Sequence, residues 1–294
     1  MKTIDYLRAI LAISCCILSA LAQSADQAQA QALTNVSYPS VLKLPQGAPA
    51  KKISYGDDAL QYGELWLPPG KMHVTGPLLV FIHGGCWLNA YDIKHAHAAT
   101  HALSQAGFAV WSLEYRRTGD VGGAWPGSFK DILQGIDYVQ QLKSYNLNTD
   151  EIILMGHSAG GHLALLAGQH YVNKEGNKKA DKNPIKGVIG LAAISDVEKY
   201  ALGKNDCQTA TPAFMGGTYS EKSAEYNLAN PMKQGFHPHT VLIHGDKDTI
   251  VPLAQSLDAK QTVKVVPGAG HFDMIHSGSK AWGVILKAID VLIE

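Results

Sequence analysis

Residues 151–167 have the sequence EIILMGHSAGGHLALLA. The apolar residues before Gly156 are typical of a short buried strand, and the Ala- and Leu-rich stretch from Ala159 onward is typical of a helix. A serine at the centre of G-x-S-x-G between a strand and a helix indicates a nucleophile elbow, a turn so tight that Gly156 and Gly160 must lack bulk. The helix N-terminus behind the serine favours negative charge. We therefore predict that Ser158 is a nucleophile at the carboxyl end of its strand.

Strand and helix patterns alternate on both sides of this stretch. Continuous apolar strands that alternate with helices predict an α/β fold with a mostly parallel central sheet and helices on both faces. One segment, residues 195–239, is longer than an ordinary connection, and such excursions are usually functional. We expect residues of about 196–239 to form a small cap insertion. Strands are expected at 60–67, 77–83, 108–115, 151–155, 188–194, 240–244 and 263–266, and helices at 92–105, 129–142, 159–167 and 281–293.

A nucleophilic serine needs a base, and the base needs an orienting carboxylate. Two loops that follow expected strands downstream of Ser158 offer them. The first loop contains both Asp246 and Asp248, and the second, PGAGH, ends in His271. His276 is an alternative base, but no glycine loop precedes it. Both loops leave the carboxyl ends of their strands, the edge at which the serine also emerges, so the residues alone predict a catalytic triad with two candidate acids.

Backbone donors for a developing oxyanion are predicted upstream, where HGGCW follows the strand expected at 77–83. Consecutive glycines let N–H groups turn toward the oxyanion without obstruction by a Cβ atom. The candidate donors are the N–H groups of Gly84, Gly85 and Cys86, together with that of Ala159 next to the serine. This combination indicates acyl-transfer chemistry.

The HGGCW and GHSAGG segments resemble signature motifs of the α/β-hydrolase superfamily, and are most similar to its carboxylesterase, hormone-sensitive-lipase-like and arylformamidase-like branches. The resemblance covers about 51–294 in motif order and implies an α/β-hydrolase fold. It implies that Asp248, within a D-x-x-V-P segment, is the triad acid and that His271 is the base. Many lipase-like relatives have a third glycine where this chain has Cys86. The donating pair is therefore either Gly84 with Gly85 or Gly85 with Cys86.

The resemblance implies a serine hydrolase that cleaves carboxylic esters through an acyl-enzyme. The modest size of the expected cap favours short or aromatic acyl groups, and the N-terminal residues described below indicate that the enzyme is exported. One alternative is an arylformamidase acting on N-formylkynurenine-type amides, which an export signal disfavours. The other is a non-catalytic binding protein on a hydrolase fold, which the complete set of triad candidates disfavours. The expected partner is a small-molecule ester.

No metal, nucleotide or flavin cofactor is expected, because the chain has no Walker segment and no zinc-spaced cysteines. Three histidines, His95, His97 and His101, lie close together in the helix expected at 92–105. No carboxylate or cysteine nearby completes a metal-binding set. We interpret the three histidines as part of a solvated helix face.

Composition limits the class of protein further. The 294 residues are 46% hydrophobic and 17% charged, with 25 basic and 25 acidic side chains. These values fit one large globular domain and exclude a disordered or polytopic membrane protein. Zero formal net charge disfavours nucleic-acid binding, which requires a basic face. The oligomeric state is left open.

The first residues predict export. A basic start and a short apolar run that ends in Ala-Leu-Ala indicate a signal peptide at 1–22, cleaved after Ala22, and a periplasmic or secreted protein with no stable membrane insertion after cleavage. Residues 23–50 are predicted to be a linker or N-terminal arm that precedes a hydrolase domain at 51–294. Cleavage leaves two cysteines, Cys86 and Cys207. An oxidising compartment favours a disulfide between them, the alternative being two free thiols.

Overall fold

The computed structural model describes residues 32–70, 74–176 and 184–294, so the predicted signal peptide and the start of the arm lie outside the described residues. Its centre is an eight-stranded sheet in which β1 and β2 pair antiparallel, β2 and β4 pair antiparallel, and all other neighbours are parallel. The protein has the predicted α/β-hydrolase fold. In sheet order the strands are β1 (Lys51–Ser54), β2 (Tyr62–Trp66), β4 (Val110–Leu113), β3 (Val74–Ile82), β5 (Leu147–His157), β6 (Ile185–Leu191), β7 (Thr240–Gly245) and β8 (Thr262–Val266).

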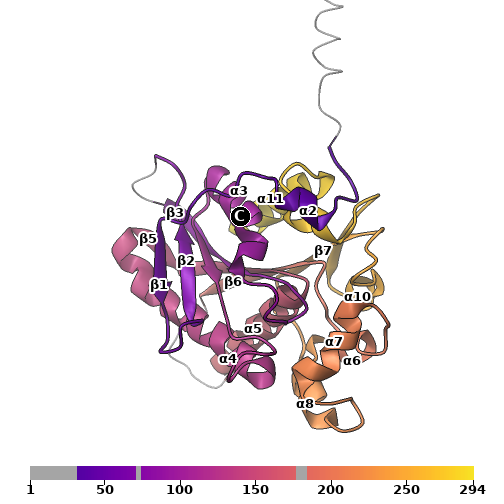
Figure 1. Ribbon diagram of the computed structural model, residues 1–294. Coiled ribbons are helices and arrows are strands. Elements are labelled where there is room, and N and C mark those ends of the chain that lie inside the picture. Colours follow the sequence, from indigo (N-terminus) through magenta and orange to yellow (C-terminus); the bar gives the residue numbers. More distant parts are fainter. Residues whose placement is uncertain (1–31, 71–73, 177–183) are drawn as a thin grey trace, which may run out of the picture. The chain divides into compact units, whose positions relative to one another are not determined.

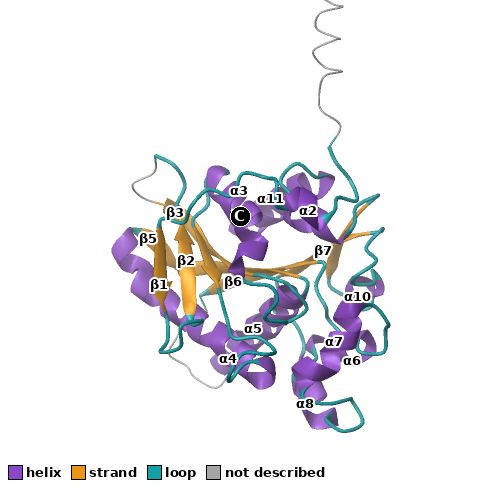
Figure 2. Cartoon of the chain, viewed as in Figure 1, coloured by secondary structure: helices purple, strands orange, loops and turns teal. Residues whose placement is uncertain are grey.

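Helices cover both faces of the sheet because alternate strand residues point to opposite sides. On β3, Leu78 and Val80 belong to the cluster that includes residues of α4 (Ala124–Asp137) and α5 (Ala159–Gly176). Leu79 and Phe81 belong to the cluster that includes residues of α3 (His97–Gln105) and α11 (Lys280–Ile293). Figures 1 and 2 show these two helical layers on either side of the sheet. The continuous apolar runs therefore reflect strands that are buried on both faces.

Several element boundaries differ from the expected ones. The helix expected at 92–105 begins as a 3₁₀ helix, η1 (Ile93–Ala96), and continues as α3, while α4 is followed by a second 3₁₀ helix, η2 (Tyr138–Tyr145). The edge strand β1 was not expected, because three of its four residues are exposed and it lacks an apolar pattern. Shorter elements complete the fold: α2 (Tyr38–Val41), α10 (Ala254–Leu257) and η3 (His271–Ile275).

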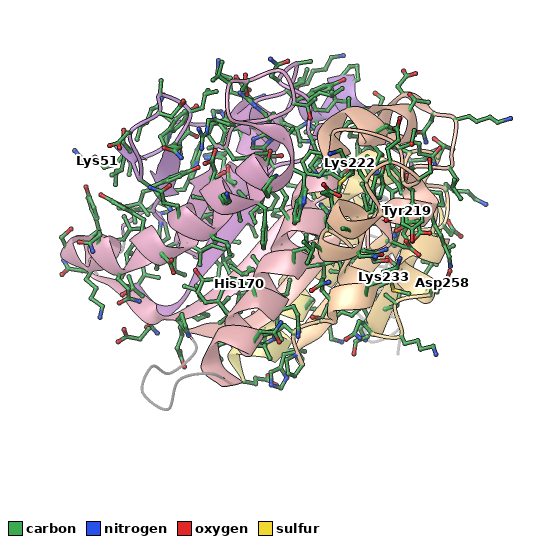
Figure 3. All side chains as sticks on the ribbon, turned by 90° about the horizontal axis from the view of Figure 1, so that it is seen from below. Lys51, His170, Tyr219, Lys222, Lys233 and Asp258 are labelled. Atoms are coloured by element: carbon green, nitrogen blue, oxygen red, sulfur yellow. A yellow bond between two sulfur atoms is a disulfide. The ribbon has the colours of Figure 1, made fainter. Side chains whose placement is uncertain are left out.

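The segment 195–239 is helical, with α6 (Val197–Tyr200), α7 (Asp206–Met215), α8 (Ser223–Leu228) and α9 (Pro231–Gln234). A capping box at Asn205 starts α7, and a disulfide joins Cys207 on this helix to Cys86 in the loop after β3. The Lys233 ammonium lies 2.6 Å from a Glu198 carboxylate oxygen and 5.2 Å from the ring centre of Tyr219; Figure 3 shows Lys233 and Tyr219 close together on this part of the molecule. The disulfide thus ties the insertion to a predicted functional loop.

Within the described part of the chain, none of the helices combines the length and the hydropathy that a membrane span requires.

Candidate active site

Ser158 occupies the sharp turn between β5 and α5. Its φ is 56°, in the left-handed region, and its N–H donates to the Leu191 carbonyl. A Cβ atom on Gly156 would lie 2.2 Å from the Gly160 carbonyl oxygen, and a Cβ atom on Gly160 would lie 2.2 Å from the Ile82 carbonyl oxygen. Both positions therefore exclude any residue larger than glycine. The tight turn inferred from GHSAGG is formed, and it directs Ser158 out of the sheet edge.

The imidazole of His271 lies beside the Asp248 carboxylate, with 2.7 Å between Nδ1 and Oδ2. The other carboxylate oxygen accepts hydrogen bonds from the N–H groups of Ile250 and Val251, each at 2.8 Å. Burial opposes ionisation of Asp248, but its electrostatic interaction with His271 and the hydrogen bonds from His244 and His271 outweigh burial, so the pKa of Asp248 lies well below its usual range. A carboxylate held ionised in this way can orient the imidazole through Nδ1 and leave Nε2 for proton transfer.

The alternative acid and base have other contacts. Asp246 accepts a hydrogen bond from the N–H of Gly268 at 2.7 Å, so it fixes the turn after β8. His276 accepts from the N–H of Gly278 at 3.1 Å. The structure therefore brings Asp248 to His271, and it gives Asp246 and His276 local hydrogen bonds in turns.

Ser158 and His271 line one cavity of about 320 Å³. The described residues contain no hydrogen bond between the Ser158 hydroxyl and His271; such catalytic hydrogen bonds often tighten only when substrate binds. The remaining wall is mainly apolar and aromatic, and its aromatic side chains are Tyr38, Tyr91 and Phe272. The geometry can therefore hold a small apolar group next to a serine and an imidazole.

The loop after β3 forms part of the wall of this cavity. Gly85, Cys86 and Trp87 have φ values of 110°, 54° and 58°, and Gly85 and Cys86 line the cavity. Among the described residues, the N–H groups of Gly85 and Cys86 have no acceptor. Of the two pairs left open by the sequence, Gly85 with Cys86 is the one in which both residues line the cavity. Ala159 is fully buried at the start of α5, where its N–H has no preceding helical turn to donate to.

Glu114 supports this loop, and no sequence motif indicated that residue. The side chain is buried, and His83 connects it to the loop: His83 Nδ1 lies 2.7 Å from the Gly84 carbonyl oxygen, and Nε2 lies 3.0 Å from a Glu114 carboxylate oxygen. Glu114 also accepts from the N–H of Ile93 and lies 3.2 Å from Arg117 Nη1. Burial raises the pKa of Glu114, but its electrostatic interaction and hydrogen bond with His83 and the charge of Arg117 outweigh burial, so the pKa of Glu114 is lowered. The site therefore includes a buried charge network that sequence spacing did not indicate.

The interpretation of His95, His97 and His101 as a solvated helix face is wrong. His95 is 5% exposed, lines the cavity and lies 3.2 Å from the His157 ring. His97 Nε2 donates to Glu64 at 2.8 Å, and the His101 ring packs near Trp66. The three histidines belong to η1 and α3, which pack against the sheet. The spacing of the histidines in the sequence did not indicate which of their side chains would be buried there. Within the described ranges, no three His, Cys, Asp or Glu residues are arranged to hold a metal ion.

The arm before β1 contributes to the site. The N–H groups of Asn35 and Val36 donate to the buried Asp273 carboxylate at 3.0 and 2.9 Å, and Asp273 also accepts from the N–H of Gly270. These bonds attach the arm to the loop that carries His271. As a result, Tyr38 forms part of the cavity wall.

Comparisons with known proteins agree with this architecture. Residues 64–263 match the model of the family described as BD-FAE. The chain is 22% identical over 244 residues to Esterase LipC of Mycobacterium tuberculosis, covering 76% of this chain and 60% of the relative. It is 25% identical over 225 residues to the probable isoprenylcysteine alpha-carbonyl methylesterase ICME of Oryza sativa subsp. japonica, covering 70% and 51%. The chain thus spans between about half and three fifths of the length of these curated relatives.

A solved structure with the same fold is esterase B from Lactobacillus rhamnosis, with a TM-score of 0.70 and 18% identity over 96% of this chain and 95% of that one. The likeness extends over nearly the whole of both chains, so the sheet and its covering helices are arranged as in that protein.

Proposed function

Because the chain belongs to the BD-FAE family of α/β-hydrolases, we propose that it is a serine hydrolase that cleaves carboxylic esters through an acyl-enzyme. One observation carries the proposal: an elbow serine, Ser158, shares a cavity with His271, whose Nδ1 lies 2.7 Å from the ionised Asp248. The esterase names of its relatives support the same reaction class.

In the proposed reaction, Ser158 Oγ attacks the ester carbonyl while His271 Nε2 accepts its proton. Asp248 holds the tautomer with a proton on Nδ1 and stabilises the imidazolium that forms. The N–H groups of Gly85, Cys86 and Ala159 are the candidate donors to the oxyanion, each worth about 3 kcal/mol in the transition state. The imidazolium then protonates the leaving alcohol. A water molecule repeats the sequence on the acyl-enzyme and releases the acid.

We propose esters with short or aromatic acyl groups as substrates. The cavity of about 320 Å³ is at the small end of ligand sites. Tyr38, Tyr91 and Phe272 offer flat apolar surfaces on which an aromatic group can stack. The size and lining of the cavity therefore favour esters with small acyl groups over esters with long acyl chains.

We further propose that the protein is exported and works in an oxidising compartment. The predicted signal peptide is the first support. The second is the Cys86–Cys207 disulfide, since such bonds persist mainly in exported proteins. Fractionation of cells that produce the full chain, with N-terminal sequencing of the product, tests this proposal. Processed protein in the exported fraction is expected, and an intact N-terminus in the cytoplasm would refute it.

The activity is tested with p-nitrophenyl esters of increasing acyl length, an aromatic ester and N-formylkynurenine. Wild-type protein is expected to hydrolyse the short and aromatic esters, and Ser158→Ala to lower kcat/KM by about 10⁴-fold or more. Ser144→Ala, at an exposed serine on η2, is the matched control and should keep wild-type activity. Activity that survives in Ser158→Ala would refute the mechanism, and a preference for N-formylkynurenine would replace the esterase proposal by the formamidase one.

A further inference from the structure

Two buried imidazoles connect the loop of His271 to the cavity wall. His157, the residue before the serine, has Nε2 3.1 Å from the carbonyl oxygen of His271. Its Nδ1 lies 3.2 Å from Nε2 of His95. His157 is fully buried and His95 is 5% exposed. The two rings therefore form a continuous chain of contacts that ends on the backbone of the proposed base.

The hydrogen bonds in this chain run in one direction. Burial, together with nearby imidazoles, lowers the pKa of His95 to about 3 and that of His157 well below its usual value, so both rings are neutral at pH 7. A neutral imidazole has one N–H, and a carbonyl oxygen only accepts. His157 Nε2 must therefore donate to His271, which leaves its Nδ1 as an acceptor. His95 Nε2 must then donate to His157, which leaves His95 Nδ1 without a proton.

Stability does not account for this chain. The remaining nitrogen, Nδ1 of His95, is buried and has no hydrogen-bond partner among the described residues. An unsatisfied buried acceptor is destabilising, and replacing both partners of a buried hydrogen bond by apolar groups of the same shape is often neutral or stabilising. Buried polar groups kept at such a cost are common where a functional geometry must be fixed.

We propose that His157 and His95 are positioning residues for His271, a directional pair of neutral imidazoles that holds its backbone carbonyl. The inference rests on the proposed function. Asp248 fixes the His271 ring through Nδ1 at 2.7 Å, and His157 fixes the peptide group of the same residue at 3.1 Å. Two fixed points leave the ring little freedom to turn away from Ser158. The ring centres of His157 and His271 are 4.5 Å apart, so an uncharged His157 also avoids repelling the imidazolium formed during catalysis.

A matched pair of variants tests the role of His157. In His157→Gln the amide nitrogen can take the place of Nε2 and donate to His271, whereas in His157→Asn the shorter amide reaches only the place of Nδ1. We expect His157→Asn to lower kcat by about 100-fold with little change in KM, because a misplacement of about 1 Å has that effect. His157→Gln should recover most of the loss. His276→Asn, at a buried histidine with only a turn contact, is the control.

Unfolding curves of the variants separate positioning from folding. We expect His157→Asn and His157→Gln to unfold at similar denaturant concentrations while their kcat values differ. Wild-type activity in His157→Asn, or equal loss in both variants, would overturn the positioning role. A wild-type protein that hydrolyses no ester would refute the proposed function and the positioning role with it, whereas wild-type turnover with an unimpaired His157→Asn variant would refute the positioning role alone.

The direction of the chain is tested independently of activity by NMR of protein labelled with ¹⁵N-histidine. Long-range ¹H–¹⁵N correlations distinguish the two neutral tautomers and the imidazolium. We expect His157 and His95 to be Nε2–H tautomers at pH 7, and His95 to remain neutral on acidification to about pH 5. An Nδ1–H tautomer or an imidazolium at either residue at pH 7 would overturn the inference.

Discussion

Removal of the disulfide by the double substitution Cys86→Ser and Cys207→Ser should lower the free energy of unfolding by about 5 kcal/mol. The two cysteines are 121 residues apart in sequence, so the bridge closes a long loop in the unfolded chain. In the chain-entropy model, a loop of that length loses about 16 cal/mol/K of conformational entropy on cross-linking, which gives this free energy at 25 °C. The bridge therefore supplies a large share of the 5–15 kcal/mol that is typical of a folded domain.

The assay is guanidinium unfolding of the mature protein under non-reducing conditions, with the free energy taken from linear extrapolation. Wild type treated with dithiothreitol should unfold at about the same concentration as the double variant. The double variant should not respond to dithiothreitol, which makes it the control for effects of the reductant. The midpoints compare stability only if the slope of the transition is the same in both proteins.

The same substitution should also reduce activity, because Cys86 follows Gly85 in the loop that faces the cavity. We expect kcat to fall more than KM rises, since donors to an oxyanion act mainly in the transition state. The predicted stabilisation by the bridge would be refuted if mass spectrometry shows an intact bridge in wild type and the free energy of unfolding of the double variant is nevertheless within about 1 kcal/mol of the wild-type value.

Other substitutions test the site separately. Asp248→Asn should lower kcat by about 10⁴-fold, since the amide favours the wrong His271 tautomer; steady-state kinetics measure this. Because the pKa of Asp248 is depressed in the folded state, its carboxylate stabilises the fold above about pH 4, and the stability gap between wild type and Asp248→Asn should narrow as the pH falls below that value. Glu114→Ala should cost about 3–5 kcal/mol in urea unfolding, because it removes the buried carboxylate that the Arg117 guanidinium and the His83 ring share. Tyr38→Ala should raise KM for aromatic esters by about three- to tenfold, with a smaller effect on aliphatic esters.

The local parts of the site follow from the sequence. The turn at Ser158 requires glycine on both sides, and a short apolar strand before it and a helix after it indicate the same turn, so neighbouring residues fix the conformation. The strand and helix patterns also extend over only a few residues each, and their alternation along the chain predicts the mostly parallel sheet. The identity of the triad acid was harder to predict from the residues. Asp246 and Asp248 lie in one loop, and only the resemblance to α/β-hydrolases favoured Asp248. In the structure the two candidates are distinguished by their hydrogen-bond partners, since Asp248 contacts His271 and Asp246 contacts Gly268.

Other parts depend on contacts between distant segments. The elbow, the glycine loops and the alternation of strands and helices can be predicted from the sequence, because they depend on backbone conformation and on periodicity over a few residues. The folded chain was needed to show that Tyr38 lines the cavity and that Glu114 supports the loop of Gly85. It was also needed to show that His95 contacts His157 in the interior. The position of a buried polar residue depends on its hydrogen-bond partners. When those partners are tens of residues away in the sequence, no periodic pattern in the chain indicates which residues folding will bring together.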